Sequence, residues 1–236
     1  MSTEHKITAS DFKFTSSGKE VPGFLARPEN VTKAPAVIVI QEWWGLNDHI
    51  KDVAERYARA GFIAAAPDLY DGTVTKDPQT ASKLMGQLKP EKGLDYLGTI
   101  ISYLRASNEV TNLGVTGFCM GGVYTLLAAC HYQFEAAVAF YGIPDNLSII
   151  SKLSCPLLFI GGEKDEWITV DKMNQLSAAL KEHGKDGEVK IYQDAPHAFF
   201  NDTRPEVYRP ADAQDAWRRT MDFFTRHLGK GQTAMA

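Results

Sequence analysis

Residues 112–127 read "NLGVTGFCMGGVYTLL" and contain the turn on which the interpretation of this chain depends. Residues 113–118 form an apolar run typical of a buried strand, and the segment after Cys119 is typical of a helix. Gly117 and Gly121 flank the cysteine in the pattern G-x-C-x-G. This is the pattern of a nucleophile elbow, a strained strand-to-helix turn whose crowded backbone requires glycine on each side. A buried structural cysteine beside ordinary turn glycines is the alternative.

Strand-like and helix-like segments alternate along the rest of the chain. We predict strands at 34–42, 62–69, 113–118, 135–142, 155–162 and 188–195, the first two of them buried, and helices at 47–61, 92–107, 120–132, 169–184 and 213–228. This alternation predicts an α/β fold with a mostly parallel, twisted sheet and helices on both faces. Residues 7–14 and 20–28 have no helix between them, which predicts an antiparallel pair at the N-terminal edge. With no linker or repeat, 1–236 is predicted to be a single domain with a frayed tail at 229–236.

The composition excludes several classes of partner. The chain has 236 residues and a formal net charge of −4, and 44% of its residues are apolar. Nucleic acid and anionic membranes both require a basic face, so neither is expected as a partner. The N-terminus lacks an apolar signal core and no apolar stretch could span a bilayer, which predicts a cytoplasmic protein. Cys119, Cys130 and Cys155 lack disulfide or zinc-site spacing and are expected to be free thiols.

Polar residues follow the predicted strands at the edge where a parallel sheet gathers its reactive groups. They are Glu42, Asp68, Cys119, Asp165 and His197. In α/β-hydrolases the catalytic residues follow the chain order nucleophile, acid, histidine. Cys119, Asp165 and His197 stand in that order, which predicts a Cys-His-Asp triad on an α/β-hydrolase fold.

Other residues compete for some of these roles. Glu163 and Glu166 lie beside Asp165 and are alternative acids. His197 has no rival, because among six histidines only His197 lies in a loop after a predicted strand, although an ordinary loop histidine is the alternative. Asp68, in "PDLY", is interpreted as a structural turn residue.

Six short motifs together resemble the dienelactone hydrolases. They are "QEWWGLN" (41–47), "APDLYDG" (66–72), "GFCMGG" (117–122), "FYG" (140–142), "GGEKD" (161–165) and "APHAF" (195–199). Members of this family are α/β-hydrolases with a Cys-His-Asp triad that open cyclic enol-lactones. The resemblance extends over nearly the whole chain, and the glutamate of the first motif is peculiar to this family.

The resemblance implies a role for each residue. Cys119 is the nucleophile, His197 the base and Asp165 the acid that orients it. Glu42 engages the resting cysteine, which stays protonated and turned away until substrate displaces the carboxylate. A carboxylate near a thiol disfavours the thiolate by like-charge repulsion, which protects the sulfur from oxidation.

The oxyanion and the substrate need further groups. The backbone N–H of Met120, directly after the nucleophile, is the general oxyanion donor of such turns, and the resemblance adds the backbone N–H of Trp43. Aromatic residues in or beside the site loops are candidates for the substrate pocket: Trp44, Tyr70, Tyr141, Trp167, Phe199 and Phe200. No metal or other cofactor is expected.

The chain departs from the family at the substrate-binding arginines. Well-known members clamp a substrate carboxylate with two arginines, one of them four residues after the histidine. That position is Asn201 here, residues 72–104 contain no arginine, and Arg204 does not match the motif. We therefore expect poor activity on dienelactone itself and a preference for neutral, apolar or aryl esters or lactones. Activated phosphotriesters are a second substrate class that the same thiolate could attack.

Two other functions fit parts of the sequence. A thiol redox sensor or binding protein could keep this fold without turnover, but it would need no complete triad, and the candidate resolving thiols Cys130 and Cys155 lie in predicted buried segments. An acyltransferase or thioesterase could use the same triad. The expected partner is a small-molecule ester or lactone, and the chain is expected to be a monomer or a homodimer.

Overall fold

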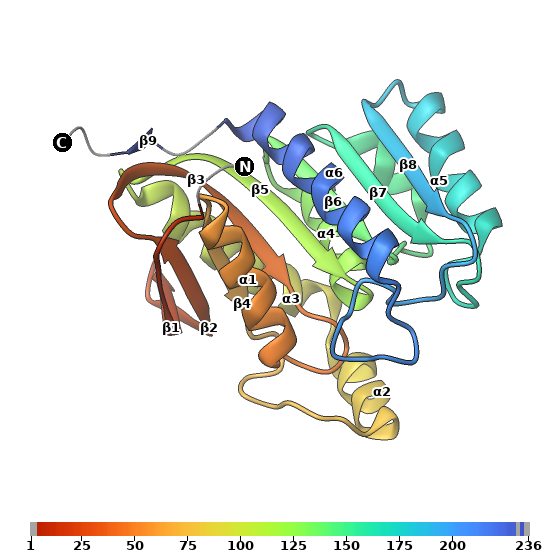
Figure 1. Ribbon diagram of the computed structural model, residues 1–236, viewed down its shortest axis with the longest axis horizontal. Coiled ribbons are helices and arrows are strands. Elements are labelled where there is room, and N and C mark those ends of the chain that lie inside the picture. Colours follow the sequence, from red (N-terminus) through yellow and green to blue (C-terminus); the bar gives the residue numbers. More distant parts are fainter. Residues whose placement is uncertain (1–3, 230–231, 234–236) are drawn as a thin grey trace. The chain divides into compact units, whose positions relative to one another are not determined.

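The computed structural model describes residues 4–229 and 232–233 (Figure 1). The chain forms two compact units. The first unit comprises residues up to Gly114 together with the end of the chain from Leu228, and the second comprises Val115–His227. Strand β5 (Val110–Phe118) begins in the first unit and ends in the second. Each unit is an α/β structure.

The first unit is built on a sheet with an antiparallel edge. Its strands are β1 (Ile7–Ser16), β2 (Lys19–Pro28), β3 (Val31–Ile40), β4 (Ile63–Pro67) and β9 (Gln232–Thr233). β1 and β2 pair antiparallel, β2 pairs antiparallel with β4, and β4 pairs parallel with β3. The turn between β1 and β2 places Ser17 and Gly18 at positive φ, as a two-residue hairpin requires. The predicted N-terminal antiparallel pair is confirmed.

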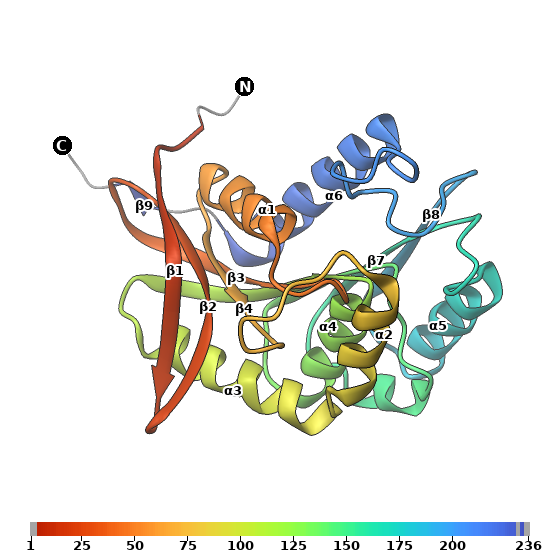
Figure 2. The same ribbon diagram turned by 90° about the horizontal axis from the view of Figure 1, so that it is seen from below.

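Three helices belong to the first unit: α1 (Asp48–Arg59), α2 (Pro78–Gln87) and α3 (Pro90–Ala106). α1 and α3 cover opposite faces of the strands of this unit (Figure 2). The sequence analysis did not predict α2. Asp77 caps it by accepting a hydrogen bond from the Thr80 backbone N–H at 2.8 Å, but only Ala81 is buried. A helix with one buried residue has no apolar period to reveal it.

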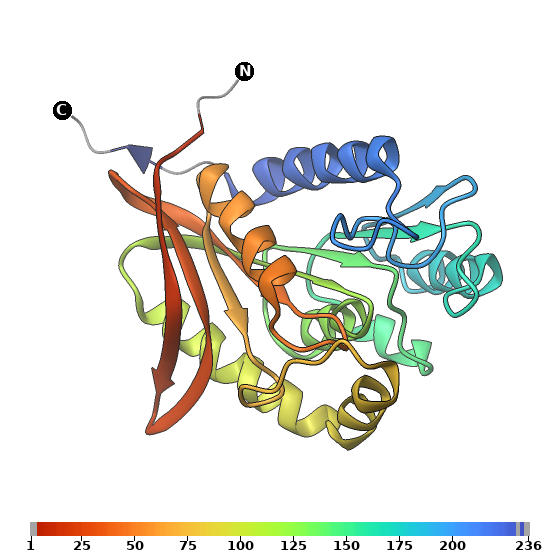
Figure 3. The same ribbon diagram turned by 60° about the horizontal axis from the view of Figure 1, so that its bottom comes forward.

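The second unit carries the remaining parallel strands and helices. Its elements are α4 (Met120–His131), β6 (Ala136–Phe140), the 3₁₀ helix η1 (Leu147–Lys152), β7 (Leu157–Gly162), α5 (Val170–Glu182), β8 (Gly187–Tyr192) and α6 (Pro210–Leu228, whose last residue falls in the first unit). β7 pairs parallel with both β6 and β8. α6 covers one face of these strands, and α4 and α5 cover the other (Figure 3).

The predicted fold class is confirmed: the chain is α/β with a mostly parallel sheet and an antiparallel N-terminal edge. The single-domain organisation of 1–236 stays a prediction, since the chain is described as two compact units. Within the predicted frayed tail at 229–236, Gln232–Thr233 form β9 against β3, while 230–231 and 234–236 lie outside the described residues. Across the described residues, no helix is both long and apolar enough for a bilayer.

Candidate active site

Cys119 occupies a strained turn between β5 and α4. Its backbone has φ 55° and ψ −115°, a conformation that side chains other than glycine rarely adopt. The turn is held by hydrogen bonds from Gly122 N and Val123 N to the Cys119 carbonyl, at 2.9 and 3.2 Å, and from Cys119 N to Phe140 O at 3.1 Å. A strained backbone of this kind persists only where the surrounding contacts hold it in place, and such strain is concentrated at functional sites.

Close backbone approach around Cys119 explains the glycines. A Cβ on Gly117 would lie 2.2 Å from the Gly121 carbonyl oxygen. A Cβ on Gly142, which follows β6, would lie 2.0 Å from the carbonyl oxygen of Cys119 itself. Neither position can carry a side chain without moving the turn. The motif pattern identified Gly117, whereas the need for glycine at 142 depends on a contact with a neighbouring strand.

Asp165 and His197 meet at the ends of β7 and β8. His197 Nδ1 lies 2.6 Å from Asp165 Oδ2, and the Asp165 side chain is fully buried. The other oxygen, Oδ1, accepts hydrogen bonds from the backbone N–H groups of Trp167 and Ile168, each at 2.9 Å. These donors orient the carboxylate and stabilise its charge. Of the three candidate acids, Asp165 is the one that contacts His197.

The surroundings of His197 favour its protonated form. Burial acts to lower its pKa, but hydrogen bonding with Asp165, interaction with the Cys119 sulfur and the negative charges of a Cys119 thiolate and of Asp165 raise the pKa to about 10, so His197 holds a proton once Cys119 has given one up. Among the described residues, the buried Nε2 atom has no partner in hydrogen-bonding geometry. The Cys119 sulfur therefore influences the histidine without an aligned hydrogen bond, an arrangement common in catalytic sites before substrate binds.

The loop that carries His197 is also strained. Asp194 and Ala198, on either side of the histidine, have φ of 56° and 61°. Tyr141, which packs against the His197 ring with centroids 5.0 Å apart, has φ 37°. Non-glycine residues at positive φ are uncommon, so their grouping around His197 marks the same site as Cys119 does.

The predicted pocket aromatics of this unit divide into two groups. Trp167 is 58% exposed, and its ring stands edge-on to His197 with centroids 4.7 Å apart. Tyr141, Phe199 and Phe200 are at most 2% exposed. Phe200 stacks on Phe118 at 5.4 Å, in the core. These three rings lie in the interior beside the site, since almost none of their surface reaches solvent.

A cavity of about 180 Å³ lies beside His197. It is lined by Lys164, Glu166, Trp167, Pro196, His197, Arg204 and Val207. The sequence analysis predicted Trp167 here but missed Lys164, Pro196, Arg204 and Val207 as pocket residues. Lys164 and Pro196 each stand one residue from a predicted triad member, and that adjacency was the available signal. No pattern in the neighbouring sequence marks Arg204 and Val207 as pocket residues. They line the cavity because the chain folds back toward His197.

Four predicted site residues belong to the first unit. Glu42 follows β3 and is 1% exposed, Tyr70 is 7% exposed, and Trp43 and Trp44 are partly exposed, with their rings 4.9 Å apart. Their approach to Cys119 stays a prediction. Asp68 accepts hydrogen bonds from the backbone N–H groups of Tyr70 and Gly72, at 2.9 and 2.6 Å, which confirms its interpretation as a turn residue.

The raised pKa of His197 makes the stability of the protein depend on pH. The pKa is about 10 in the folded protein against 6.5 for an unperturbed histidine, so the stabilisation is complete below pH 6.5 and is lost as pH rises through 10. We expect urea denaturation to show that the free energy of unfolding of the wild type falls between pH 6.5 and 10. The fall should be steeper than that of the His197→Gln variant, by up to about 1.4 kcal/mol per pH unit. Burial raises the pKa of Cys130 to about 11 and of Cys155 to about 12, but both thiols are common to the two proteins. Parallel curves would contradict this expectation.

A strained cysteine between a strand and a helix, with a buried Asp-His pair after later strands, defines an α/β-hydrolase. The model of the dienelactone hydrolase family matches residues 21–228, and this chain belongs to that family. The resemblance to the dienelactone hydrolases is confirmed, and the chain is a hydrolase. Within the described residues, no group of three His, Cys, Asp or Glu side chains is placed to hold a metal ion.

Relatives match along almost their full length. Protein usf of Aquifex pyrophilus is 36% identical over 228 residues, covering 92% of this chain and 97% of that protein. A Bradyrhizobium protein named as a candidate 2-oxo-3-(5-oxofuran-2-ylidene)propanoate lactonase is 34% identical over 229 residues, covering 90% and 92%. The crystal structure of a candidate dienelactone hydrolase from Klebsiella pneumoniae matches with a TM-score of 0.86 and 31% identity, covering 94% of this chain and 99% of that one.

Proposed function

We propose that this protein hydrolyses carboxylic esters or lactones of small molecules through an acyl-enzyme on Cys119. The observation that carries the proposal is the Asp165–His197 contact of 2.6 Å in the same compact unit as the strained Cys119 turn. A histidine held by a buried carboxylate is a general base with a defined tautomer, because Nδ1–H donates to the carboxylate and Nε2 is left to accept a proton. The lactonase name of the Bradyrhizobium relative supports the same reaction class.

The proposed reaction has two halves. His197 Nε2 takes the thiol proton, and the Cys119 sulfur attacks the carbonyl carbon of the substrate. The oxyanion is stabilised by the backbone N–H groups of Met120, the first residue of α4, and of Trp43. Collapse breaks the carbon–oxygen bond, and His197 returns its proton to the leaving alkoxide. His197 then takes a proton from water, and the resulting hydroxide attacks the thioester carbon. Collapse breaks the carbon–sulfur bond and releases the carboxylic acid, and His197 returns its proton to the Cys119 thiolate.

Glu42 has a separate role in the proposal. Its carboxylate keeps the resting Cys119 protonated until substrate displaces it, as the family resemblance implies. The lack of an aligned hydrogen bond to His197 Nε2 in the described residues supports a resting thiol that is not yet engaged with its base. Burial of Glu42 at 1% exposure strengthens its electrostatic influence on any neighbouring group.

The charges around the cavity support a neutral substrate. Arg204 Nε lies 2.8 Å from Glu206 Oε1, and Lys164 Nζ lies 4.0 Å from Asp194 Oδ1. Glu166 adds a further negative charge to the lining. Each cation is thus offset by a carboxylate, so the cavity lacks the net positive charge that holds a substrate carboxylate. Trp167 beside His197 offers an apolar surface to an aryl or alkyl group.

A pre-steady-state experiment tests the proposal. Mixing the protein with a neutral aryl ester in a stopped-flow instrument is expected to release a burst of phenol stoichiometric with enzyme. Intact mass spectrometry should show the acyl mass, and digestion should place it on the peptide containing Cys119. Turnover without a burst or acyl mass, or acylation of another residue, would contradict a Cys119 acyl-enzyme. An absence of both burst and turnover would favour the thiol-sensor function.

The other two cysteines weigh against a sensor. A disulfide-forming sensor needs a resolving thiol that ionises near neutral pH. Burial raises the pKa of Cys130 to about 11 and that of Cys155 to about 12, so both stay protonated in that range. A complete Asp-His pair has no use in such a sensor, whereas hydrolysis requires it.

A further inference from the structure

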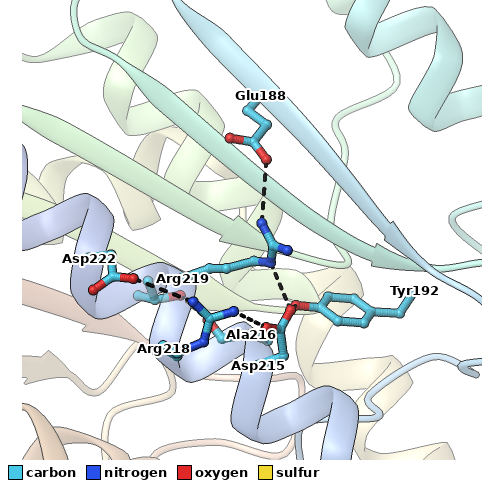
Figure 4. Close-up of polar contacts among 8 residues, drawn as sticks. Glu188, Tyr192, Asp215, Ala216, Arg218, Arg219 and Asp222 are labelled. Atoms are coloured by element: carbon cyan, nitrogen blue, oxygen red, sulfur yellow. Dashed lines mark hydrogen bonds and ion pairs between the residues drawn. The ribbon is translucent and has the colours of Figure 1, made fainter.

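Tyr192, the last residue of β8, is anchored to α6 by a partly buried hydrogen bond to a carboxylate (Figure 4). Its hydroxyl donates to Asp215 Oδ2 at 2.8 Å, and the residue is 5% exposed. Asp215 Oδ2 also accepts from Arg219 Nε at 2.7 Å, and Asp215 Oδ1 accepts from Arg218. A tyrosine hydroxyl bonded to an ionised carboxylate makes a stronger hydrogen bond than one between neutral groups.

The charges of this cluster keep the bond formed. Hydrogen bonding from Arg219 is the main reason that the pKa of Asp215 lies well below its usual range, so the carboxylate is ionised. Burial and the bond to Asp215 raise the pKa of Tyr192, so the hydroxyl keeps its proton. Arg219 also lies 3.9 Å from Glu188 near the start of β8. The hydrogen bond to Tyr192 at the end of β8 is thus the main polar link, because the Arg219–Glu188 pair near its start is exposed and contributes little.

The backbone of Tyr192 connects this anchor to both catalytic loops. Its carbonyl oxygen accepts hydrogen bonds from Glu163 N at 2.9 Å and from Ala195 N at 3.4 Å. Glu163 is two residues before Asp165, and Ala195 is two residues before His197. The position of the Tyr192 carbonyl thus sets where both loops leave the sheet.

The ring of Tyr192 reaches the histidine by a second route. It packs on Phe199 with centroids 5.1 Å apart, and Phe199 packs on Tyr141 at 6.0 Å. Tyr141 in turn packs against His197 at 5.0 Å. A shift of the Tyr192 ring is therefore transmitted to His197 through two fully buried aromatic residues, because close-packed interiors transmit strain.

We propose that Tyr192 and Asp215 are positioning residues for the Asp165–His197 pair. Neither touches the reacting atoms. The hydrogen bond between them fixes the end of β8, and with it the distance and angle at which His197 faces Asp165 and Cys119. The expected effect on turnover rests on the proposed function. The expected effect on the Asp165–His197 hydrogen bond depends only on the contacts described above.

The test compares Tyr192→Phe with the wild type. This variant keeps the ring and its packing on Phe199 and removes only the hydroxyl. We expect kcat for a neutral aryl ester to fall about 10-fold with KM unchanged, since small misplacements of catalytic groups cost rate rather than binding. We also expect the low-field proton NMR signal of His197 Nδ1–H to shift upfield or to broaden. Asp215→Asn, which keeps an acceptor without the charge, should give a smaller change in the same direction.

A matched control separates positioning from general destabilisation. Asp222→Asn removes an exposed carboxylate from the same helix, one that lies 3.7 Å from Arg218 and has no contact with Asp215 in the described structure. It should leave kcat and the NMR signal unchanged. If Tyr192→Phe lowers only the melting temperature and leaves kcat and the NMR signal at wild-type values, the positioning role is wrong. If neither the wild type nor any variant hydrolyses esters, the proposed function is wrong. The NMR signal of His197 still tests the positioning role in that case.

Discussion

Cys119→Ala is expected to lower kcat for ester hydrolysis by at least about 10⁴-fold, because the whole covalent pathway depends on the sulfur. The expected residual activity comes from oxyanion donors and binding, which remain. The variant should fold normally, since alanine is smaller and relaxes the contacts of a turn already held by Gly122 and Val123. Steady-state kinetics on a neutral aryl ester, with circular dichroism to confirm folding, measures this effect.

Cys130→Ala is the matched control. Cys130 lies on the same helix, α4, and is a free thiol, but burial keeps it protonated at neutral pH. Its replacement should leave kcat and the burst amplitude at wild-type values. Retention of most of the activity by Cys119→Ala, or loss of the burst in Cys130→Ala, would place the nucleophile elsewhere.

Asp165→Asn is expected to lower kcat by about 10⁴-fold, for a reason specific to this geometry. Oδ1 of Asp165 accepts hydrogen bonds from Trp167 N and Ile168 N, so the amide oxygen of asparagine will occupy that position. The amide NH₂ then faces His197 Nδ1 and donates to it. Nδ1 becomes an acceptor and the proton moves to Nε2, so the imidazole can no longer take the thiol proton of Cys119.

The pH dependence of the Asp165→Asn variant tests the same point. Loss of the Asp165 charge and hydrogen bond removes a main cause of the raised pKa of His197, so that pKa should fall from about 10. Glu163→Gln and Glu166→Gln, which remove the neighbouring carboxylates, should lower kcat far less. A larger loss in either of them than in Asp165→Asn would show that the acid had been assigned to the wrong residue.

Much of the fold could be predicted because its signals are local. The buried strands β3 to β7 are short apolar runs, and α1 and α5 follow two of them with helical spacing and recognisable ends. Asn47, for example, caps α1 by accepting a hydrogen bond from Ile50 N at 3.1 Å. α2 was not predicted because it is almost wholly exposed. A helix shows apolar residues at helical spacing only when one of its faces is buried.

The candidate site could be predicted where chemistry constrains the chain locally. Gly117 precedes the turn at Cys119 because a Cβ there would meet the Gly121 carbonyl oxygen, and the order of Cys119, Asp165 and His197 follows from the order of the strands that carry them. The role of the aromatic residues as a substrate pocket stays a prediction. Aromatic residues are favoured equally by a pocket and by a core, so sequence cannot distinguish exposed Trp167 from buried Phe199.

By itself, the sequence determined the class of fold and identified Cys119 as the candidate nucleophile and His197 as the candidate base, because each depends on residue types within a few positions of one another. Only the tertiary structure decided that Asp165 contacts His197, that Gly142 must leave room for the Cys119 carbonyl, and that Tyr192 is tied to Asp215. These are distances between segments separated by more than twenty residues. The physical reason is that such distances are set by how strands and helices pack across the sheet, and packing depends on the whole core rather than on any local stretch of chain.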